Sequence, residues 1–131
     1  MEYSLKRIFC VDDDDDILTI AKLCLEKIGG FEVTCVLRSV DALWTVRALH
    51  PDLILVDVMM PVVDGPTMLK RIREDETLRG IPVAFLTARV HNDEVREYLE
   101  LGAAGVIAKP FDPTKLCEQV TSIWEQYLLA A

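Results

Sequence analysis

Short apolar runs alternate with longer amphipathic runs five times along this chain, and that alternation limits the fold more than any other feature. The run Leu53-Ile54-Leu55-Val56 is apolar at every position, which is typical of a strand covered on both faces. Five strand–helix units in succession predict a doubly wound α/β fold, a parallel sheet with helices on both faces. The predicted strands span residues 7–11, 31–37, 53–56, 81–86 and 105–108, and the predicted helices span 15–28, 39–49, 64–75, 92–101 and 113–128.

Residues that start and stop helices support these boundaries. Gly29 and Gly30 end the first predicted helix, and Pro51 prevents the second from continuing. Ser39 is predicted to be the N-cap of the second helix, because Ser is a preferred acceptor for the first backbone N–H groups. Pro82 is compatible with a strand only at its start. The chain has no repeat, low-complexity linker or change of composition, so its 131 residues are expected to form one domain.

The charge balance narrows the classes of partner. The chain has 14 basic and 22 acidic residues and a formal net charge of −8. This balance argues against unaided nucleic-acid binding, which needs Lys and Arg at phosphates, and favours metal ions or basic surfaces as partners. No apolar run reaches the length of a membrane span, and the amino terminus lacks the apolar core of a signal peptide. We therefore expect a cytoplasmic protein without membrane insertion.

The cysteines and histidines show no recognisable metal-binding or catalytic pattern. No Cys-x-x-Cys pair is present, so the thiols are expected to be small buried side chains in a reducing compartment. His50 and His91 lie in predicted loops without neighbours that indicate a catalytic triad or a metal cage. The cysteines are Cys10, Cys24, Cys35 and Cys117.

Polar side chains follow four of the predicted strands at the point where each strand ends. The acidic run Asp12–Asp16 follows the first strand, Asp57 the third, Thr87 the fourth and Lys109 the fifth. Ligands of doubly wound sheets bind beyond the carboxyl ends of the strands, so these residues mark the predicted functional edge. The last two aspartates of the run fall where a helix N-terminus favours negative charge, and that alone explains them.

Asp12, Asp13 and Asp57 are the candidate metal ligands. Three carboxylates at one edge repel one another unless a cation joins them. Mg²⁺ suits such a cluster because it binds one or two carboxylates, keeps several waters and accepts phosphate oxygens. No glycine-rich phosphate loop is present, so a bound nucleotide is not expected. A carboxylate nucleophile, a metal, a threonine and a lysine are the parts that phosphoryl transfer needs.

Four motifs resemble the receiver domain of two-component response regulators, and they cover nearly the whole chain in the same order. The stretch from Leu55 to Gly65 is the most specific, since it joins an aspartate to a Met-Pro step and an Asp-Gly step. The resemblance implies a single receiver domain over residues 1–131 with five parallel strands in the flavodoxin-like order 2-1-3-4-5. The motifs are Val11-Asp12-Asp13, Leu55-Val56-Asp57-Val58-Met59-Met60-Pro61-Val62-Val63-Asp64-Gly65, Leu86-Thr87-Ala88 and Lys109-Pro110-Phe111.

The resemblance implies roles for the acidic residues. Asp57 would accept a phosphoryl group from a phosphohistidine on a sensor histidine kinase or a histidine phosphotransfer protein. Asp13, Asp57 and the backbone carbonyl of Met59 would bind Mg²⁺ directly, and Asp12 would act through a water. A domain of this kind is not an enzyme, because it catalyses only its own phosphorylation and dephosphorylation.

The resemblance also implies how the signal is passed on. Thr87 would hydrogen-bond the phosphoryl group, Lys109 would form an ion pair with it, and the Lys109-Pro110 peptide bond would be cis. The resulting change of conformation would control a downstream protein target or an output domain. Met59 and Arg89 flank the site at positions that set the lifetime of the phosphoryl group in the family, and we expect the same here.

One position departs from the family pattern. Receiver domains commonly carry a Tyr or Phe in the last strand, and its ring moves inward as the threonine moves. Val106 takes that position here and has no ring, so the aromatic readout is in doubt. This departure keeps open an alternative function, a pseudo-receiver that binds partners without phosphorylation, although the intact acidic residues argue against it.

A phosphatase of the haloacid-dehalogenase type is the second alternative. That family uses an aspartyl-phosphate in an Asp-x-Asp-x-Thr/Val pattern, which would place the nucleophile at Asp13. Ile17 takes the last position of the pattern, and the chain leaves little room for a substrate-selecting cap. The start at Met1 and the end soon after the last predicted helix slightly favour a stand-alone domain over part of a longer chain.

Overall fold

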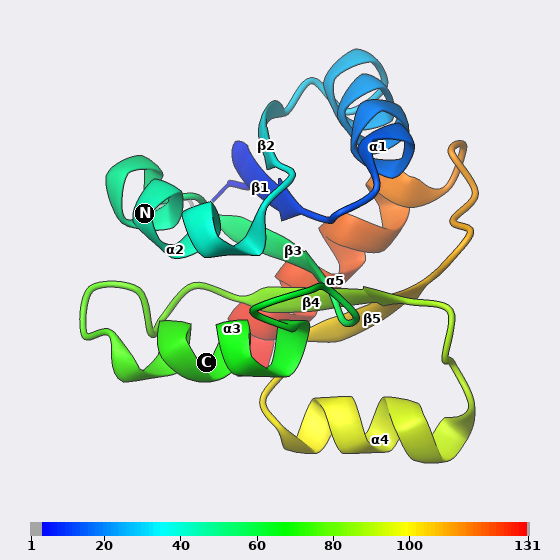
Figure 1. Cartoon of the computed structure of the whole chain (residues 1–131). Coiled ribbons are helices and arrows are strands. Elements are labelled where there is room, and N and C mark those ends of the chain that lie inside the picture. Colours follow the sequence, from blue (N-terminus) through cyan, green and yellow to red (C-terminus); the bar gives the residue numbers. More distant parts are fainter. Residues whose placement is uncertain (1–3, 131) are drawn as a thin grey trace.

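The computed structural model describes residues 4–130, in which strands and helices alternate without exception (Figure 1). The strands are β1 (Arg7–Val11), β2 (Glu32–Val36), β3 (Leu53–Asp57), β4 (Val83–Thr87) and β5 (Gly105–Ala108). The helices are α1 (Asp15–Lys27), α2 (Ser39–Leu49), α3 (Gly65–Glu74), α4 (Asn92–Glu100) and α5 (Leu116–Ala130).

The sheet is parallel throughout and has the strand order β2-β1-β3-β4-β5, which confirms the predicted fold. The order reverses between β1 and β3, which lie side by side at the centre. Val11 of β1 lies opposite Val56 of β3, so the chain leaves both strands at the same level. The next residues, Asp12 and Asp57, are therefore brought together at this reversal point, where ligands of doubly wound sheets bind.

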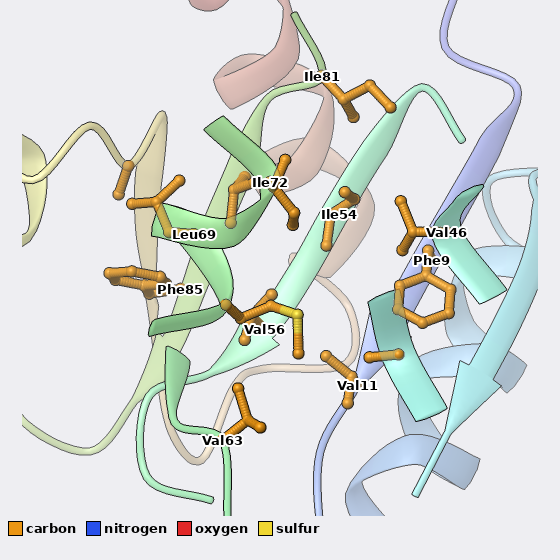
Figure 2. Close-up of a cluster of buried hydrophobic side chains, with 14 of the residues drawn as sticks. Phe9, Val11, Val46, Ile54, Val56, Val63, Leu69, Ile72, Ile81 and Phe85 are labelled. Atoms are coloured by element: carbon orange, nitrogen blue, oxygen red, sulfur yellow. The ribbon is translucent and has the colours of Figure 1, made fainter. Parts of the chain in front are cut away.

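Two layers of helices cover the sheet. Helices α1 and α5 pack on one face, and α2, α3 and α4 pack on the other (Figure 1). Every residue of β3 and β4 is buried because both faces of these central strands are covered. Figure 2 shows the α2/α3 side of the core, where Leu69 and Ile72 of α3 lie near Val56 and Phe85 of the sheet.

The prediction that Ser39 is an N-cap is wrong. Arg38 occupies the cap position of α2 and makes no side-chain cap hydrogen bond, and Ser39 is the first residue of the helix. The buried Ser39 hydroxyl instead donates to the carbonyl of Pro61 at 2.8 Å and accepts from the N–H of Val63 at 3.2 Å. The side chain thus joins α2 to the β3–α3 loop rather than closing its own helix.

Most predicted boundaries differ from the structure by at most one residue, and two predicted starts differ by two or three residues. Strand β4 begins at Val83 rather than residue 81, so Pro82 stands before it. Helix α5 begins at Leu116 rather than residue 113. Residues 113–115 form a turn that leads into it, in which the Asp112 carboxylate accepts from the N–H and hydroxyl of Thr114 and the Asp112 carbonyl accepts from the N–H of Leu116. Neither shift moves a residue of the predicted functional edge.

All four cysteines contribute to the core on the α1/α5 face of the sheet. Cys10 and Cys24 are buried as predicted, whereas Cys35 and Cys117 are half-buried, and all four are free thiols. Within residues 4–130, no helix is both long enough and apolar enough to cross a membrane.

Candidate functional site

Three carboxylates converge at the carboxyl edge of the sheet. One oxygen from each of Asp12, Asp13 and Asp57 lies within 4.8 Å of the others. Asp12 is fully buried and Asp57 is 5% exposed, while Asp13 is exposed. The adjacency of β1 and β3 produces this cluster, which is the set of residues that the sequence predicted.

Lys109 is the cation of the cluster. Its ammonium Nζ lies 2.7 Å from Asp12 Oδ2 and 3.0 Å from Asp57 Oδ1. Lys109 follows the edge strand β5, and its backbone N–H donates to the carbonyl of Thr87 at 2.8 Å, which holds it beside β4. The Lys109-Pro110 peptide bond is cis, as the resemblance implies.

Thr87 ends β4, the strand between β3 and β5. Its side chain is buried, and its hydroxyl oxygen accepts a hydrogen bond from the backbone N–H of Arg89 at 3.0 Å. In the register of the sheet, Thr87 lies opposite Ala108, directly before Lys109. All five candidate site residues that the sequence predicted at strand ends therefore lie at one edge.

Burial and the Lys109 ammonium shift the pKa of Asp57 in opposite directions. Burial, together with the nearby charge of Asp12, raises the pKa of the Asp57 carboxyl to about 6, and the hydrogen bond from Lys109 limits the rise. Burial alone would lower the pKa of Lys109, but its bonds to Asp12 and Asp57 outweigh burial and raise that pKa. The site therefore favours a charged lysine beside a carboxylate that is more basic than usual.

The donor set fits a divalent cation of the Mg²⁺ type. Three carboxylates and one ammonium leave a formal charge of −2 at the cluster when all are ionised. Hard oxygen donors are the ligands that Mg²⁺ prefers. The buried Asp12 Oδ2 contacts the Lys109 ammonium but has no hydrogen-bond donor in good geometry, so its acceptor capacity is not used up within the protein.

The Asp64-Gly65 step shapes the loop that follows the acidic residue of β3. Asp64 caps α3, its carboxylate accepting from the N–H of Thr67 at 2.8 Å, and Gly65 donates its N–H to the carbonyl of Val58. A Cβ atom on Gly65 would lie 2.9 Å from the carbonyl oxygen of Asp57. The glycine is therefore required for α3 to begin against the end of β3.

The position that usually carries an aromatic ring is half-buried Val106, which lies opposite Phe85 of β4. The ring that packs against Phe85 comes instead from Tyr98 of α4, edge-on at a centroid distance of 5.4 Å. The sequence analysis did not single out Tyr98. Its signal was an aromatic residue one turn after Val95 in a helix that is otherwise mostly charged.

The remaining candidates lie outside the carboxylate cluster. Asp14 is the N-cap of α1 and accepts from the N–H groups of Asp16 and Ile17, and Asp15 lies in the first turn of that helix. The Asp-x-Asp pair that a dehalogenase-type phosphatase needs is therefore not assembled at the cluster, because Asp15 is absent from it.

Comparisons with known proteins agree with this geometry. The family model for the response regulator receiver domain matches residues 8–121. The chain is 36% identical over 120 residues to the transcriptional regulatory protein CseB of Streptomyces coelicolor, covering 92% of this chain and 50% of that protein. It is 33% identical over 126 residues to the alkaline phosphatase synthesis transcriptional regulatory protein PhoP of Bacillus subtilis, covering 96% and 51%. The chain thus spans about half the length of these relatives.

The fold also matches solved structures over almost their full length. The chemotaxis response regulator CheY4 of Vibrio cholerae superposes with a TM-score of 0.84 at 27% identity, covering 92% of this chain and 99% of that one. The expectation of no nucleic-acid contact has no support from the comparisons, since two relatives are named as transcriptional regulators, and it stays a prediction. On the family match, the motifs and the sheet order together, the chain belongs to the response regulator receiver domains.

Proposed function

We propose that the chain is a phosphoacceptor receiver in which Asp57 takes a phosphoryl group from a phosphohistidine and the change of state controls a partner protein. The observation that carries the proposal is the buried Asp57 carboxylate, 3.0 Å from the Lys109 ammonium and clustered with Asp12 and Asp13. A raised pKa makes the carboxylate a better nucleophile, while the Lys109 ammonium beside it would offset the charge that a phosphoryl group brings.

The proposed transfer forms one bond and breaks one bond, and it needs no third reactant. A carboxylate oxygen of Asp57 forms a bond to phosphorus, the phosphorus–nitrogen bond of the phosphohistidine breaks, and its electron pair returns to the imidazole. Hydrolysis reverses the state, because water then takes the phosphoryl group and regenerates the carboxylate. Asp13, Asp57 and the Met59 carbonyl would hold Mg²⁺, with Asp12 acting through a water. The cation would neutralise charge on the phosphoryl oxygens.

Thr87 and Lys109 are proposed to report the change. A hydroxyl can both accept and donate, so Thr87 can keep its contact with the Arg89 N–H or turn to donate to a phosphoryl oxygen. The backbone bond from Lys109 to Thr87 ties the ends of β4 and β5 together. A phosphoryl group on Asp57 would therefore shift the conformation of both strand ends together. Met59 and Arg89 would set how long the anion lasts.

Membership of the family implies a sensor kinase as the kind of partner, and the particular upstream and downstream partners are part of the proposal. A sensor histidine kinase or a phosphotransfer protein would supply the phosphoryl group, and a protein target or an output domain would receive the signal. A cytoplasmic location, a single receiver domain over residues 1–131 and the lack of activity beyond its own phosphorylation and dephosphorylation belong to the same proposal. No observation favours the pseudo-receiver, since the acidic cluster and Lys109 are complete.

Intact-mass measurement after incubation with acetyl phosphate tests this proposal. The expected result is one added phosphoryl group that depends on Mg²⁺ and is lost in Asp57→Asn. Asp14→Asn is the matched control, because Asn caps a helix as well as Asp and residue 14 lies outside the cluster. No added mass under any condition, or equal labelling of Asp57→Asn, would contradict the proposal.

A further inference from the structure

Val62, in the β3–α3 loop, has a backbone conformation that β-branched residues rarely adopt. Its φ is +71°, in the left-handed region, and its side chain is 85% exposed. Such a conformation costs on the order of 1–3 kcal/mol and persists only where the surroundings impose it. In this conformation the apolar side chain of Val62 is exposed to solvent, where a polar side chain would cost less free energy to hydrate.

The Val63 N–H donates to the Pro61 carbonyl at 2.8 Å, which closes a tight turn around Val62. Ser39 braces this turn from the neighbouring helix. Its hydroxyl bonds the carbonyl of Pro61 and the N–H of Val63, the residues on either side of Val62. Val63 is also buried in the core, where Figure 2 shows its side chain near the end of the cluster. With both neighbours held, Val62 has no freedom to turn its side chain inward.

A pocket of about 300 Å³ lies beside this loop, between it and the start of α2. Its apolar walls come from Leu37, Val40, Met60, Pro61 and Val62. Leu37 and Val40 are each exposed by more than two-fifths. The pocket is therefore an apolar hollow open to solvent, of a size that holds one or two side chains rather than a whole cofactor.

Trp44 extends the apolar surface along α2. It stands one helical turn after Val40, on the same face of the helix, and is 74% exposed. Single exposed apolar residues are ordinary, but here three exposed aliphatic residues line one pocket and the tryptophan stands beside one of them, so the four form a group. We define the α2 patch as Leu37, Val40, Trp44 and Val62.

The charges around the α2 patch are predominantly negative. Asp13 lines the pocket, and Asp14, Asp15 and Asp16 follow it along the chain. Within residues 4–130 none of these four carboxylates has an ion-pair partner, while Arg38 at the pocket lies 3.9 Å from Asp41. A ligand that brings positive charge would therefore be favoured at this surface.

We propose that the α2 patch is a docking surface for a protein segment with an apolar anchor residue flanked by Lys or Arg. The anchor fills the pocket and packs on Trp44, a residue type that often dominates binding energy at interfaces. The basic residues lie along the unpaired aspartates. A second copy of this chain is a poor occupant, because it brings the same negative charge. The docking is proposed for the unphosphorylated protein without Mg²⁺, and Asp13 is the one residue that it shares with the proposed metal site.

Three labelled peptides test the proposal by fluorescence anisotropy, with EDTA present and no phosphodonor. One has a central Leu-Phe pair between lysines, the second has glutamates in place of the lysines, and the third has alanines in place of the pair. The first is expected to bind at least about tenfold more tightly than either of the others, a difference of ~1.4 kcal/mol. Similar affinities for the first and third peptides would overturn the apolar anchor, and similar affinities for the first and second would overturn the charge argument.

Two variants locate the binding. Val62→Asn removes the apolar side chain while Asn tolerates the left-handed conformation, so this variant should fold at least as well as the parent. Val62→Asn and Trp44→Ser are each expected to weaken the first peptide by about fivefold or more. Leu129→Ser, at an equally exposed leucine near the end of α5, should have no effect. Unchanged affinity in Val62→Asn and Trp44→Ser would overturn the proposal, as would sedimentation showing that Trp44 instead joins two copies of the chain.

Discussion

At the scale of single residues, the site depends on how Asp57 and Lys109 change each other's charge. Burial raises the pKa of Asp57 to about 6, and the Lys109 ammonium 3.0 Å away keeps the rise from going further. At neutral pH the carboxylate is still mostly ionised and available as a nucleophile. Keeping the buried carboxylate ionised costs free energy, and a bound cation would lower that cost.

The first prediction concerns the titration of Asp57. Its pKa in the folded protein is above the usual 3.8, so the folded state binds the proton more tightly than the unfolded state does. Between about pH 4 and 6 this group therefore makes the protein less stable as pH rises. Carbon NMR of the carboxyl, assigned with Asp57→Asn, should show a midpoint near 6 that Mg²⁺ lowers. A midpoint near 4 without Mg²⁺ would contradict the burial argument.

The second prediction concerns Lys109→Ala. Without the ammonium, the buried carboxylates of Asp12 and Asp57 face each other unpaired, so the pKa of Asp57 should rise further. Urea unfolding at pH 7 should show a loss of about 1–3 kcal/mol, less at pH 5, where Asp57 is protonated. Lys115→Ala is the control, since residue 115 is exposed and makes no ion pair among the described residues. An equal loss in both variants would show that the ion pairs do not matter.

At the scale of helices and strands, the site depends on how closely α3 begins to the end of β3. Gly65 makes this close start possible, because a Cβ at residue 65 would meet the backbone of Asp57 and Val58 at 2.9 Å. The start of the helix therefore positions one end of the loop that carries Met59, while the Ser39 bonds to Pro61 and Val63 hold the part around Val62.

The third prediction compares Gly65→Ala with Gly80→Ala. The first variant forces backbone apart and should lose about 1–3 kcal/mol of stability, together with phosphorylation rate. The second places its Cβ in open space, with nothing within 4 Å, and should change stability by less than about 1 kcal/mol. Chemical denaturation of both variants measures the difference. Equal stabilities would show that the loop adapts freely.

The sequence predicts the elements well and the contacts between distant loops poorly. Alternating strands and helices were readable because apolar periodicity is local, and Asp64-Gly65-Pro66 signalled the start of α3 from cap and turn chemistry. The true role of Ser39 was not readable, because its partners, Pro61 and Val63, lie more than twenty residues away. A serine before a helical run looks the same in the sequence whether its hydroxyl caps that helix or bonds to a distant loop.

At the scale of the whole molecule, the negative charge and the acidic cluster predict a protein that is more stable with a divalent cation. The net charge of −8 includes three carboxylates that the fold holds within 4.8 Å of one another. Their repulsion opposes folding, and a bound cation reverses it. If the cluster binds a cation as proposed, folding and metal binding are linked, each favouring the other.

The fourth prediction states the size of that linkage. Mg²⁺ at 10 to 100 times its dissociation constant should stabilise the protein by roughly 1.4–2.7 kcal/mol in thermal or urea unfolding. NaCl at matched ionic strength should give much less, because screening acts on exposed charges only. Asp13→Ala should lose most of the gain, and Asp14→Asn should keep it. Equal stabilisation by NaCl would indicate general screening rather than a site.

The motifs of the receiver domain contain the residues that the structure brings together at the ends of β1, β3, β4 and β5, which are Asp12, Asp13, Asp57, Thr87 and Lys109. The resemblance identified neither Tyr98, which packs edge-on against Phe85, nor the α2 patch. Trp44 and Val62 are far apart in the sequence, and the Ser39 bonds to Pro61 and Val63 join the strained loop to α2. Such surfaces depend on this chain's own contacts rather than on the shared pattern.

The measurement that tests the central claim most directly is the location of the phosphoryl group. Borohydride reduces an aspartyl phosphate to homoserine, so peptide mapping after acetyl phosphate, Mg²⁺ and borohydride identifies the modified residue. We expect homoserine at residue 57 alone, and none when Mg²⁺ is withheld. Homoserine at residue 13, the nucleophile of the dehalogenase-type alternative, or at no aspartate in the chain, would contradict the account.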